Sequence, residues 1–102
     1  MSARQWQGRI MDSTDTTADQ NWTQTPDGLV ADFATGTMVR GLDFVTRIVG
    51  VAEAANHHPD IDLRYPRVRL TLITHDAENT VTEKDHALAR QISQIAADLG
   101  ID

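Results

Sequence analysis

The spacing of hydrophobic residues changes repeatedly along this chain between the period of a β-strand and that of an α-helix. Residues 29–33 and 68–75 alternate hydrophobic and polar side chains, which is typical of strands with one face packed on a core. Residues 38–56 and 82–99 instead repeat hydrophobic side chains every three or four positions, as amphipathic helices do. With 102 residues, this pattern predicts one α+β domain whose helices cover one face of an antiparallel sheet.

Turn signals separate the expected strands and complete the order of elements. Pro26-Asp27-Gly28 predicts a β-hairpin between residues 22–25 and 29–33, because proline fixes φ and glycine accepts a positive φ. Pro66-Arg67 divides residues 61–75 into two further strands. The expected order is strand, strand, helix, strand, strand, helix, which gives a four-stranded antiparallel sheet with helices on one face.

Each expected helix carries a hydrophobic stripe and a recognisable boundary. The stripe of the first helix consists of Leu42, Val45, Ile48, Val49, Ala52 and Ala55. The stripe of the second consists of Leu88, Ile92, Ile95 and Leu99. Pro59 ends the first helix near His57 or His58, because proline disfavours helical backbone at the residue before it. Thr82 and Asp85 are spaced as a capping box at the start of the second helix.

Composition and charge exclude several classes of protein. The formal net charge is −6 and no cluster of Lys and Arg offsets it, which argues against binding nucleic acid through its phosphates. The absence of cysteine excludes disulfides, thiolate metal ligands and a cysteine nucleophile. No apolar run reaches the roughly 18 residues of a membrane span, and no signal-peptide core is recognisable, so the sequence predicts a cytoplasmic protein without membrane contact.

The N-terminal segment differs from the rest of the chain. Residues 1–20 include a polar stretch over 12–20 that has too few hydrophobic side chains to pack on its own. We interpret residues 1–20 as a poorly defined segment, in which Trp6 and Ile10 are spaced as in a short helix. Residues 21–102 are then expected to form the single folded domain.

Three of the four histidines stand at the ends of expected elements. His57 and His58 lie where the first helix ends, and His75 lies at the end of a strand, before a polar loop. Loops and element ends commonly carry function, and imidazole exchanges protons near neutral pH. The histidines by themselves leave three interpretations open. They could form an acid–base site, a polar helix end whose imidazolium the helix dipole favours, or a zinc site.

The zinc interpretation has the weakest support. Adjacent histidines can both ligate a metal only with an unusual backbone, and no HxH or HExxH spacing is present. We therefore expect no metal ligand. Glu53 precedes His57 by four residues, which predicts an exposed acid–imidazolium pair on one helix face. Asp85 is explained by helix capping alone, and His86 is expected on the surface.

The histidines belong to a longer pattern that resembles the pterin-4a-carbinolamine dehydratase family. The matching residues are Glu53-Ala-Ala-Asn-His57-His58-Pro59, Tyr65, Val68-Arg-Leu-Thr-Leu-Ile-Thr74-His75-Asp76 and Thr82-Glu-Lys-Asp85, with Trp22, Phe33 and Phe44 at hydrophobic positions. The resemblance covers about residues 21–99. His-His-Pro followed by Thr-His at the end of the next long strand is its most specific part.

The resemblance implies an activity and a set of site residues. The family dehydrates 4a-hydroxytetrahydropterin to quinonoid dihydropterin, a hydro-lyase reaction that recycles tetrahydropterin without metal or cofactor. It implies catalytic roles for His57, His58 and His75, with most of the proton transfer at His58 and His75. It also implies supporting or substrate-binding roles for Glu53, Pro59, Asp60, Ile61, Tyr65, Thr74 and Asp85. The family fold is the same four-stranded sheet with helices on one side, assembled as homodimers or homotetramers.

One loop departs from the family pattern. Residues 76–81 lack the usual glycines and are one residue longer, so Asn79 is expected to take the left-handed conformation. This departure leaves open an alternative function, a catalytically weak or inactive binding or assembly module on the same fold, such as a dimerisation cofactor. Apart from this alternative, residues 68–73 could form a sheet edge that pairs with another subunit.

Overall fold

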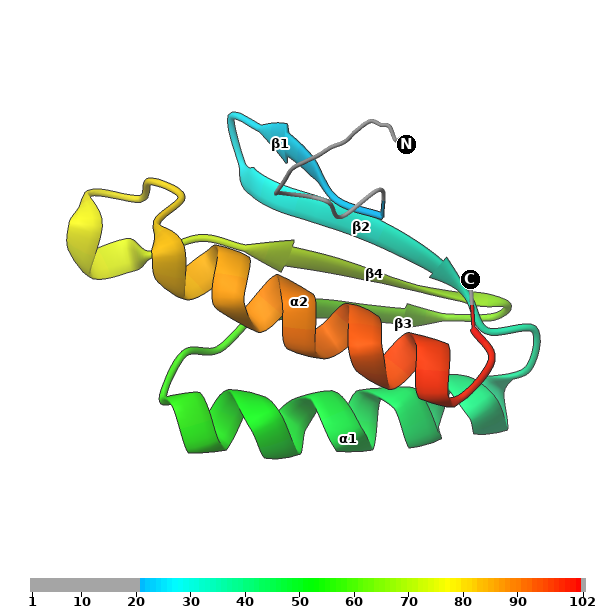
Figure 1. Cartoon of the computed structure of the whole chain (residues 1–102). Coiled ribbons are helices and arrows are strands. Elements are labelled where there is room, and N and C mark those ends of the chain that lie inside the picture. Colours follow the sequence, from blue (N-terminus) through cyan, green and yellow to red (C-terminus); the bar gives the residue numbers. More distant parts are fainter. Residues whose placement is uncertain (1–20, 102) are drawn as a thin grey trace, which may run out of the picture.

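The computed structural model describes residues 21–101 as one sheet with two helices (Figure 1). The elements are β1 (Thr23–Thr25), β2 (Gly28–Ala34), α1 (Met38–Ala55), β3 (Asp60–Arg64), β4 (Arg67–Leu72), a 3-10 turn η2 (His75–Ala77) and α2 (Glu83–Asp98). The strands lie in the order β1-β2-β4-β3, all antiparallel, and both helices cover one face. The predicted α+β fold is confirmed. The short helix expected around Trp6 and Ile10 lies outside the described residues.

Strand β4 lies inside the sheet. It is hydrogen-bonded to β2 on one side and to β3 on the other. The expectation that residues 68–73 form a sheet edge is therefore wrong, and the edges are β1 and β3. The physical reason is burial, because the inward side chains Val68, Leu70 and Leu72 are fully buried. An inner position removes the most apolar surface from water.

Two phenylalanines occupy the centre of the core. Phe33 on β2 and Phe44 on α1 are fully buried and meet edge to face, with ring centroids 5.1 Å apart. Trp22 lies edge-on to Phe33 and donates its indole N–H to Ser93 of α2. The predicted inward faces of the strands are confirmed, since Leu29 and Ala31 are buried on the same side as Phe33. Strand alternation thus indicated which side chains reach the helices.

The hydrophobic face of α1 differs from the predicted stripe. Its buried residues are Gly41, Phe44, Ile48 and Ala52, whereas Leu42, Val49 and Ala55 are exposed and Val45 is half-buried. Gly41 explains the shift, because a Cβ there would lie only 2.8 Å from a methyl group of Leu63. The missing side chain lets α1 approach β3 closely. The other apolar side chains consequently remain on the outer surface.

The boundaries of two elements also differ from the prediction. α1 is helical only to Ala55, and Asn56 ends it in the left-handed conformation, with φ of 51°. β4 ends at Leu72, so His75 begins η2 instead of ending a strand. The cause is an isolated bridge between Thr74 and Thr80, which folds the chain back on itself directly after β4. Both differences affect histidines, and they set the geometry of the site described below.

The predicted stripe of α2 agrees with the structure and yields a stability prediction. Leu88 and Ile92 are buried, and Ile95 and Leu99 are half-buried. Ile92→Val removes one methyl group from a fully buried position, which should lower the free energy of unfolding by about 0.5–1.5 kcal/mol. Urea denaturation followed by circular dichroism measures this change.

A matched variant on the outer face of α1 controls this measurement. Val39 is 78% exposed, so Val39→Ala should alter the free energy of unfolding by no more than about 0.5 kcal/mol. Equal decreases in the free energy of unfolding for Ile92→Val and Val39→Ala would contradict the described core.

Candidate active site at one end of the sheet

Three segments that are distant in sequence meet at one end of the sheet (Figure 1). Asp60 at the start of β3 pairs with Thr71 near the end of β4, so the residues before β3 and after β4 lie at the same end. The first of these segments is His57-His58-Pro59, and the second begins at His75. The start of α2 joins them there through Asp85. The antiparallel register therefore brings the segments that carry His57 and His75, 18 residues apart in the chain, to the same end of the sheet.

Asp85 connects the three segments. Its carboxylate is fully buried, and its Oδ1 lies 2.6 Å from Nε2 of His57. Its Oδ2 accepts the hydroxyl of Thr74 at 2.7 Å and the backbone N–H of Thr82 at 2.9 Å. The Thr82 bond is one half of the predicted capping box, so the capping role of Asp85 is confirmed. The same side chain also fixes the ends of α1 and β4.

The hydrogen-bond partners of Asp85 stabilise its ionised form. Burial by itself raises the pKa of a carboxyl group. The hydrogen bonds from His57, the Thr82 backbone and Thr74 outweigh that effect, so the pKa of Asp85 lies below its ordinary value. Asp85 is therefore an acceptor-only carboxylate at neutral pH. His57 must donate Nε2–H to it, which leaves the lone pair of the neutral ring on Nδ1.

His58 and His57 have different partners and different exposure. The side chain of His57 is only 12% exposed, whereas His58 and Glu53 are both largely exposed. Nε2 of His58 lies 2.5 Å from a carboxylate oxygen of Glu53. The expected pair of Glu53 with His57 is therefore wrong. The left-handed turn at Asn56 takes His57 off the helix face that carries Glu53.

His75 lies exposed at the start of η2, beside Asn79. Its Nδ1 is 2.8 Å from the amide oxygen of Asn79. The expected left-handed conformation of Asn79 is confirmed, with φ of 59°, and Glu78 has the same φ. His75 lines a surface hollow together with Pro26, Asp27, Asp60, Thr71, Ile73 and Asn79. This hollow adds the β1–β2 turn to the site.

The remaining site residues predicted from the sequence divide into two groups. Thr74 is buried in the Asp85 network, Pro59 is half-buried, and Asp60 shares the hollow with His75. Ile61 packs against the core. Tyr65 is 71% exposed and follows β3 at the opposite end of the sheet, where Arg64 pairs with Arg67. The structure therefore does not bring Tyr65 to the histidines.

Sequence reasoning missed two contributions to this site. The Pro26-Asp27-Gly28 motif predicts only a turn for Asp27, because a motif that is fully explained by backbone geometry gives no signal of a second role. The contact between Asn79 and His75 was also missed. Its four-residue spacing is visible in the sequence, but it becomes informative only once η2 is known to follow His75.

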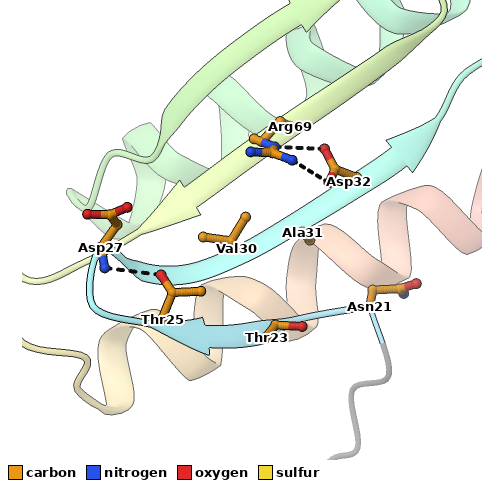
Figure 2. A pocket seen from close by; sticks show the side chains of 8 residues that line it. All are labelled: Asn21, Thr23, Thr25, Asp27, Val30, Ala31, Asp32 and Arg69. Carbon is orange, nitrogen blue, oxygen red and sulfur yellow. Dashed lines mark hydrogen bonds and ion pairs between the residues drawn. The ribbon is translucent and has the colours of Figure 1, made fainter.

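A second hollow lies on the face of the sheet opposite the helices (Figure 2). Its main polar feature is Arg69, which makes two hydrogen bonds to the carboxylate of Asp32, at 2.9 and 3.0 Å. The hydrogen bond from Arg69 holds the pKa of Asp32 below its ordinary value. This hollow contains no histidine. An internally satisfied ion pair offers no obvious proton donor or acceptor near neutral pH, so the histidine end is the better candidate site.

Neither a cluster of metal ligands nor a membrane-spanning helix is found in the part of the chain that the structure describes. Among residues 21–101, no group of three or more His, Asp or Glu side chains is placed to hold a metal ion. Over the same residues, neither α1 nor α2 combines the length and hydrophobicity that a membrane crossing requires.

Comparisons with known sequences give a consistent family. The family model described as pterin 4 alpha carbinolamine dehydratase matches residues 5–95. A Chloroflexus aurantiacus protein provisionally named pterin-4-alpha-carbinolamine dehydratase is 48% identical over 75 residues, covering 74% of this chain and 80% of that protein. A Thermomicrobium roseum protein of the same name is 42% identical over 76 residues, covering 74% of this chain and 81% of that protein.

Solved structures give the same fold. A Brucella melitensis structure described as a transcriptional coactivator/pterin dehydratase has a TM-score of 0.70 and 32% identity, covering 76% of this chain and 83% of that one. A pterin dehydratase-like protein described as a RuBisCO assembly factor in the alpha-carboxysome has a TM-score of 0.60 and 22% identity, covering 74% and 86%. At that identity the second structure supports the fold alone.

Proposed function

Because this chain belongs to the pterin 4 alpha carbinolamine dehydratase family, we propose that His57, His58 and His75 carry out the dehydration of a 4a-hydroxytetrahydropterin at the end of its sheet. The activity is that of a hydro-lyase, and the product is the quinonoid dihydropterin. The observation that carries the assignment of residues is shared by all three imidazoles. Each has one ring nitrogen hydrogen-bonded to a side-chain oxygen, which leaves the other nitrogen to exchange a proton.

The chemistry requires one proton acceptor and one proton donor. A base removes the proton from N5 of the pterin, and the electrons of the N5–H bond form the C4a=N5 double bond. The C4a–O bond breaks, and an acid protonates the leaving hydroxyl group to give water. Imidazoles can serve in both roles near neutral pH.

Exposure distinguishes the roles of the three histidines. His58 and His75 are exposed, so we assign most of the proton transfer to them. His57 is mostly buried and is hydrogen-bonded to Asp85, so we assign it a less mobile position at the wall of the site.

The supporting residues act through the histidines. Glu53 holds His58, and Asp85 holds His57 while Thr74 holds Asp85. Asp60 lines the hollow beside His75. Pro59 fixes the backbone between His58 and β3. Tyr65 is left out of the proposed site because of its place at the other end of the sheet.

The dehydration of freshly generated 4a-hydroxytetrahydropterin, followed by stopped-flow absorbance, tests the proposed function. Wild-type protein should accelerate the spontaneous reaction in proportion to its concentration. Circular dichroism of the same sample establishes that the protein is folded. Folded wild-type protein that gives no acceleration would refute the proposed function.

The departure of residues 76–81 from the family pattern favours one alternative, a catalytically weak or inactive binding or assembly module. Glu78 and Asn79 both take a conformation that glycine adopts more easily, so this loop differs in residue type where the hollow is formed. A stable pterin analogue distinguishes the two functions. A dehydratase should gain thermal stability with analogue concentration, because a ligand that binds only the native state stabilises it by mass action.

We also propose that the chain assembles as a homodimer or homotetramer. The outer face of α1 exposes Met38, Val39, Leu42 and Val49. Several exposed large hydrophobic side chains on one helix commonly mark a protein interface. Light scattering coupled to size-exclusion chromatography measures the mass in solution, and a monomer at micromolar concentration would argue against assembly.

A further inference from the structure

The hydrogen bond between His75 and Asn79 determines where the ring of His75 carries its proton. The amide oxygen of Asn79 can only accept a hydrogen bond. Nδ1 of His75, 2.8 Å away, is therefore the nitrogen that donates. In the neutral ring the lone pair then lies on Nε2. This atom is left to exchange a proton with a molecule bound in the hollow that His75 and Asn79 both line.

The loop that carries this pair is closed at its base. The backbone N–H of Thr74 donates to the carbonyl of Thr80 at 2.9 Å, and the hydroxyl of Thr80 donates to the carbonyl of Ala77 at 2.7 Å. Between these anchors, Glu78 and Asn79 both have φ of 59°. Asparagine is among the few residues other than glycine that adopt this conformation readily. Asn79 can therefore make the tight turn and also present an acceptor to His75.

We propose that Asn79 is a positioning residue for His75, which fixes the Nδ1–H tautomer and turns Nε2 toward the substrate. This inference rests on the proposed dehydratase function. Asn79 acts through His75 and is not assigned a contact with reacting atoms.

The type of partner distinguishes His75 from the other two histidines. His57 and His58 are held by carboxylates, whereas His75 is held by a neutral amide. Asn79 therefore orients the ring without adding charge. The charged groups around His75 are Asp27 from the β1–β2 turn and Asp60 from β3, which line the hollow, with Asp76 and Glu78 in its own loop.

Three variants separate positioning from loop structure. Asn79→Gly keeps the positive φ easily accessible and removes the acceptor. Asn79→Asp restores an acceptor oxygen at the same place. Glu78→Gly makes the same relaxation one residue earlier, at an equal φ, and is expected to keep the hydrogen bond between Asn79 and His75. It is the matched control for any effect of glycine on the loop.

The decisive readout is the tautomer of His75, measured by long-range ¹⁵N correlation spectra of the imidazole nitrogens in neutral rings. Wild type, Glu78→Gly and Asn79→Asp should show Nδ1–H, whereas Asn79→Gly should lose this preference. Steady-state kinetics should show kcat lowered about tenfold in Asn79→Gly with KM changed less than about twofold, because orientation at the reacting atoms is what is lost. Asn79→Asp should recover most of kcat.

Three results would each contradict either the positioning role of Asn79 or the proposed dehydratase function. An unchanged His75 tautomer in folded Asn79→Gly overturns the positioning role, whatever happens to the rate. Equal losses of kcat in Asn79→Gly and Glu78→Gly also overturn it, because they would trace the effect to the loop backbone. A third result would overturn the proposed function instead. In that case the tautomer of His75 depends on Asn79, but the wild-type protein does not catalyse dehydration, and the positioning of His75 by Asn79 still holds.

Discussion

His75→Ala is expected to slow the catalysed dehydration roughly 10²-fold or more, because removal of a general acid or base typically costs at least that factor. The side chain is exposed and begins a short 3-10 turn, so its loss should leave the fold and thermal stability nearly unchanged. His58→Ala should slow the reaction by a similar factor, because His58 has the same assigned role in proton transfer. Its stability should also change little, since His58 is exposed and pairs with Glu53 at the surface. Stopped-flow absorbance gives the rates, and thermal denaturation gives the stabilities.

His86 provides a matched control for the loss of an imidazole. It is exposed in the first turn of α2, as expected from the sequence, and the proposed mechanism does not use it. His86→Ala should retain the wild-type rate. If folded His75→Ala and His58→Ala both retained that rate as well, the assignment of proton transfer to these histidines would be wrong. A loss in all three variants would indicate a general effect of charge or stability.

The sequence predicted the sheet and its inward faces because strand alternation reports burial directly. Leu29, Ala31 and Phe33 had to share one face, whatever lay next to them. The face of α1 could not be chosen in the same way, because two hydrophobic stripes run along this helix. The choice depended on Gly41, whose missing side chain admits Leu63. A glycine gives no hydrophobic signal, so no count of apolar spacing could reveal that contact.

The sequence indicated which residue types form the site, but not which residues contact one another there. The position of His57 and His58 at a helix end followed from Pro59. The partner of His57 did not, because Asp85 is 28 residues away and its capping motif already explained it. Tyr65 fits the family pattern in the chain, but the register of β3 with β4 carries it to the other end of the sheet. Long-range pairings of this kind require the three-dimensional fold.

Asp85→Ala is expected to lower the free energy of unfolding by at least about 3 kcal/mol, because it leaves three buried or half-buried donors without their acceptor. These donors are Nε2–H of His57, the hydroxyl of Thr74 and the backbone N–H of Thr82. Urea denaturation at neutral pH measures the loss. A decrease below about 1 kcal/mol would show that Asp85 does not hold these segments together.

Asp85→Asn separates the catalytic consequence from the structural one. An amide of the same shape can still accept from Thr82 and Thr74 through its oxygen, which should preserve the fold. Its NH₂ group would then face Nε2 of His57 and require that nitrogen to accept, so His57 should change to the Nδ1–H tautomer. We expect the dehydration rate to fall about tenfold or more with a smaller loss of stability than in Asp85→Ala. An unchanged rate would remove His57 from the mechanism.

Acid should reduce the contribution of Asp85 to the free energy of unfolding. Its pKa in the folded protein lies below its ordinary value, so the native state favours the ionised carboxylate more than the unfolded chain does. The resulting stability is fully present above the ordinary aspartate pKa of about 3.9 and disappears as the pH falls through the folded pKa. The difference in free energy of unfolding between wild type and Asp85→Asn should therefore shrink when denaturation is repeated at pH 3 instead of pH 7.

Asp32 gives the comparison for this pH effect. Its pKa is also lowered, by the hydrogen bond from Arg69, but the pair is exposed on the open face of the sheet. Solvent screens such a pair, so Asp32→Asn should change stability little at either pH. The pKa values of Asp85 and Asp32 are thus lowered in the same direction, but the expected effects on stability differ. The buried Asp85, which is bonded to three segments, should give a large pH-dependent effect, and the exposed Asp32, which is bonded to one arginine, should give a small one. If the two variants responded equally to acid, the connection of the three segments by Asp85 would not be the source of the pH dependence.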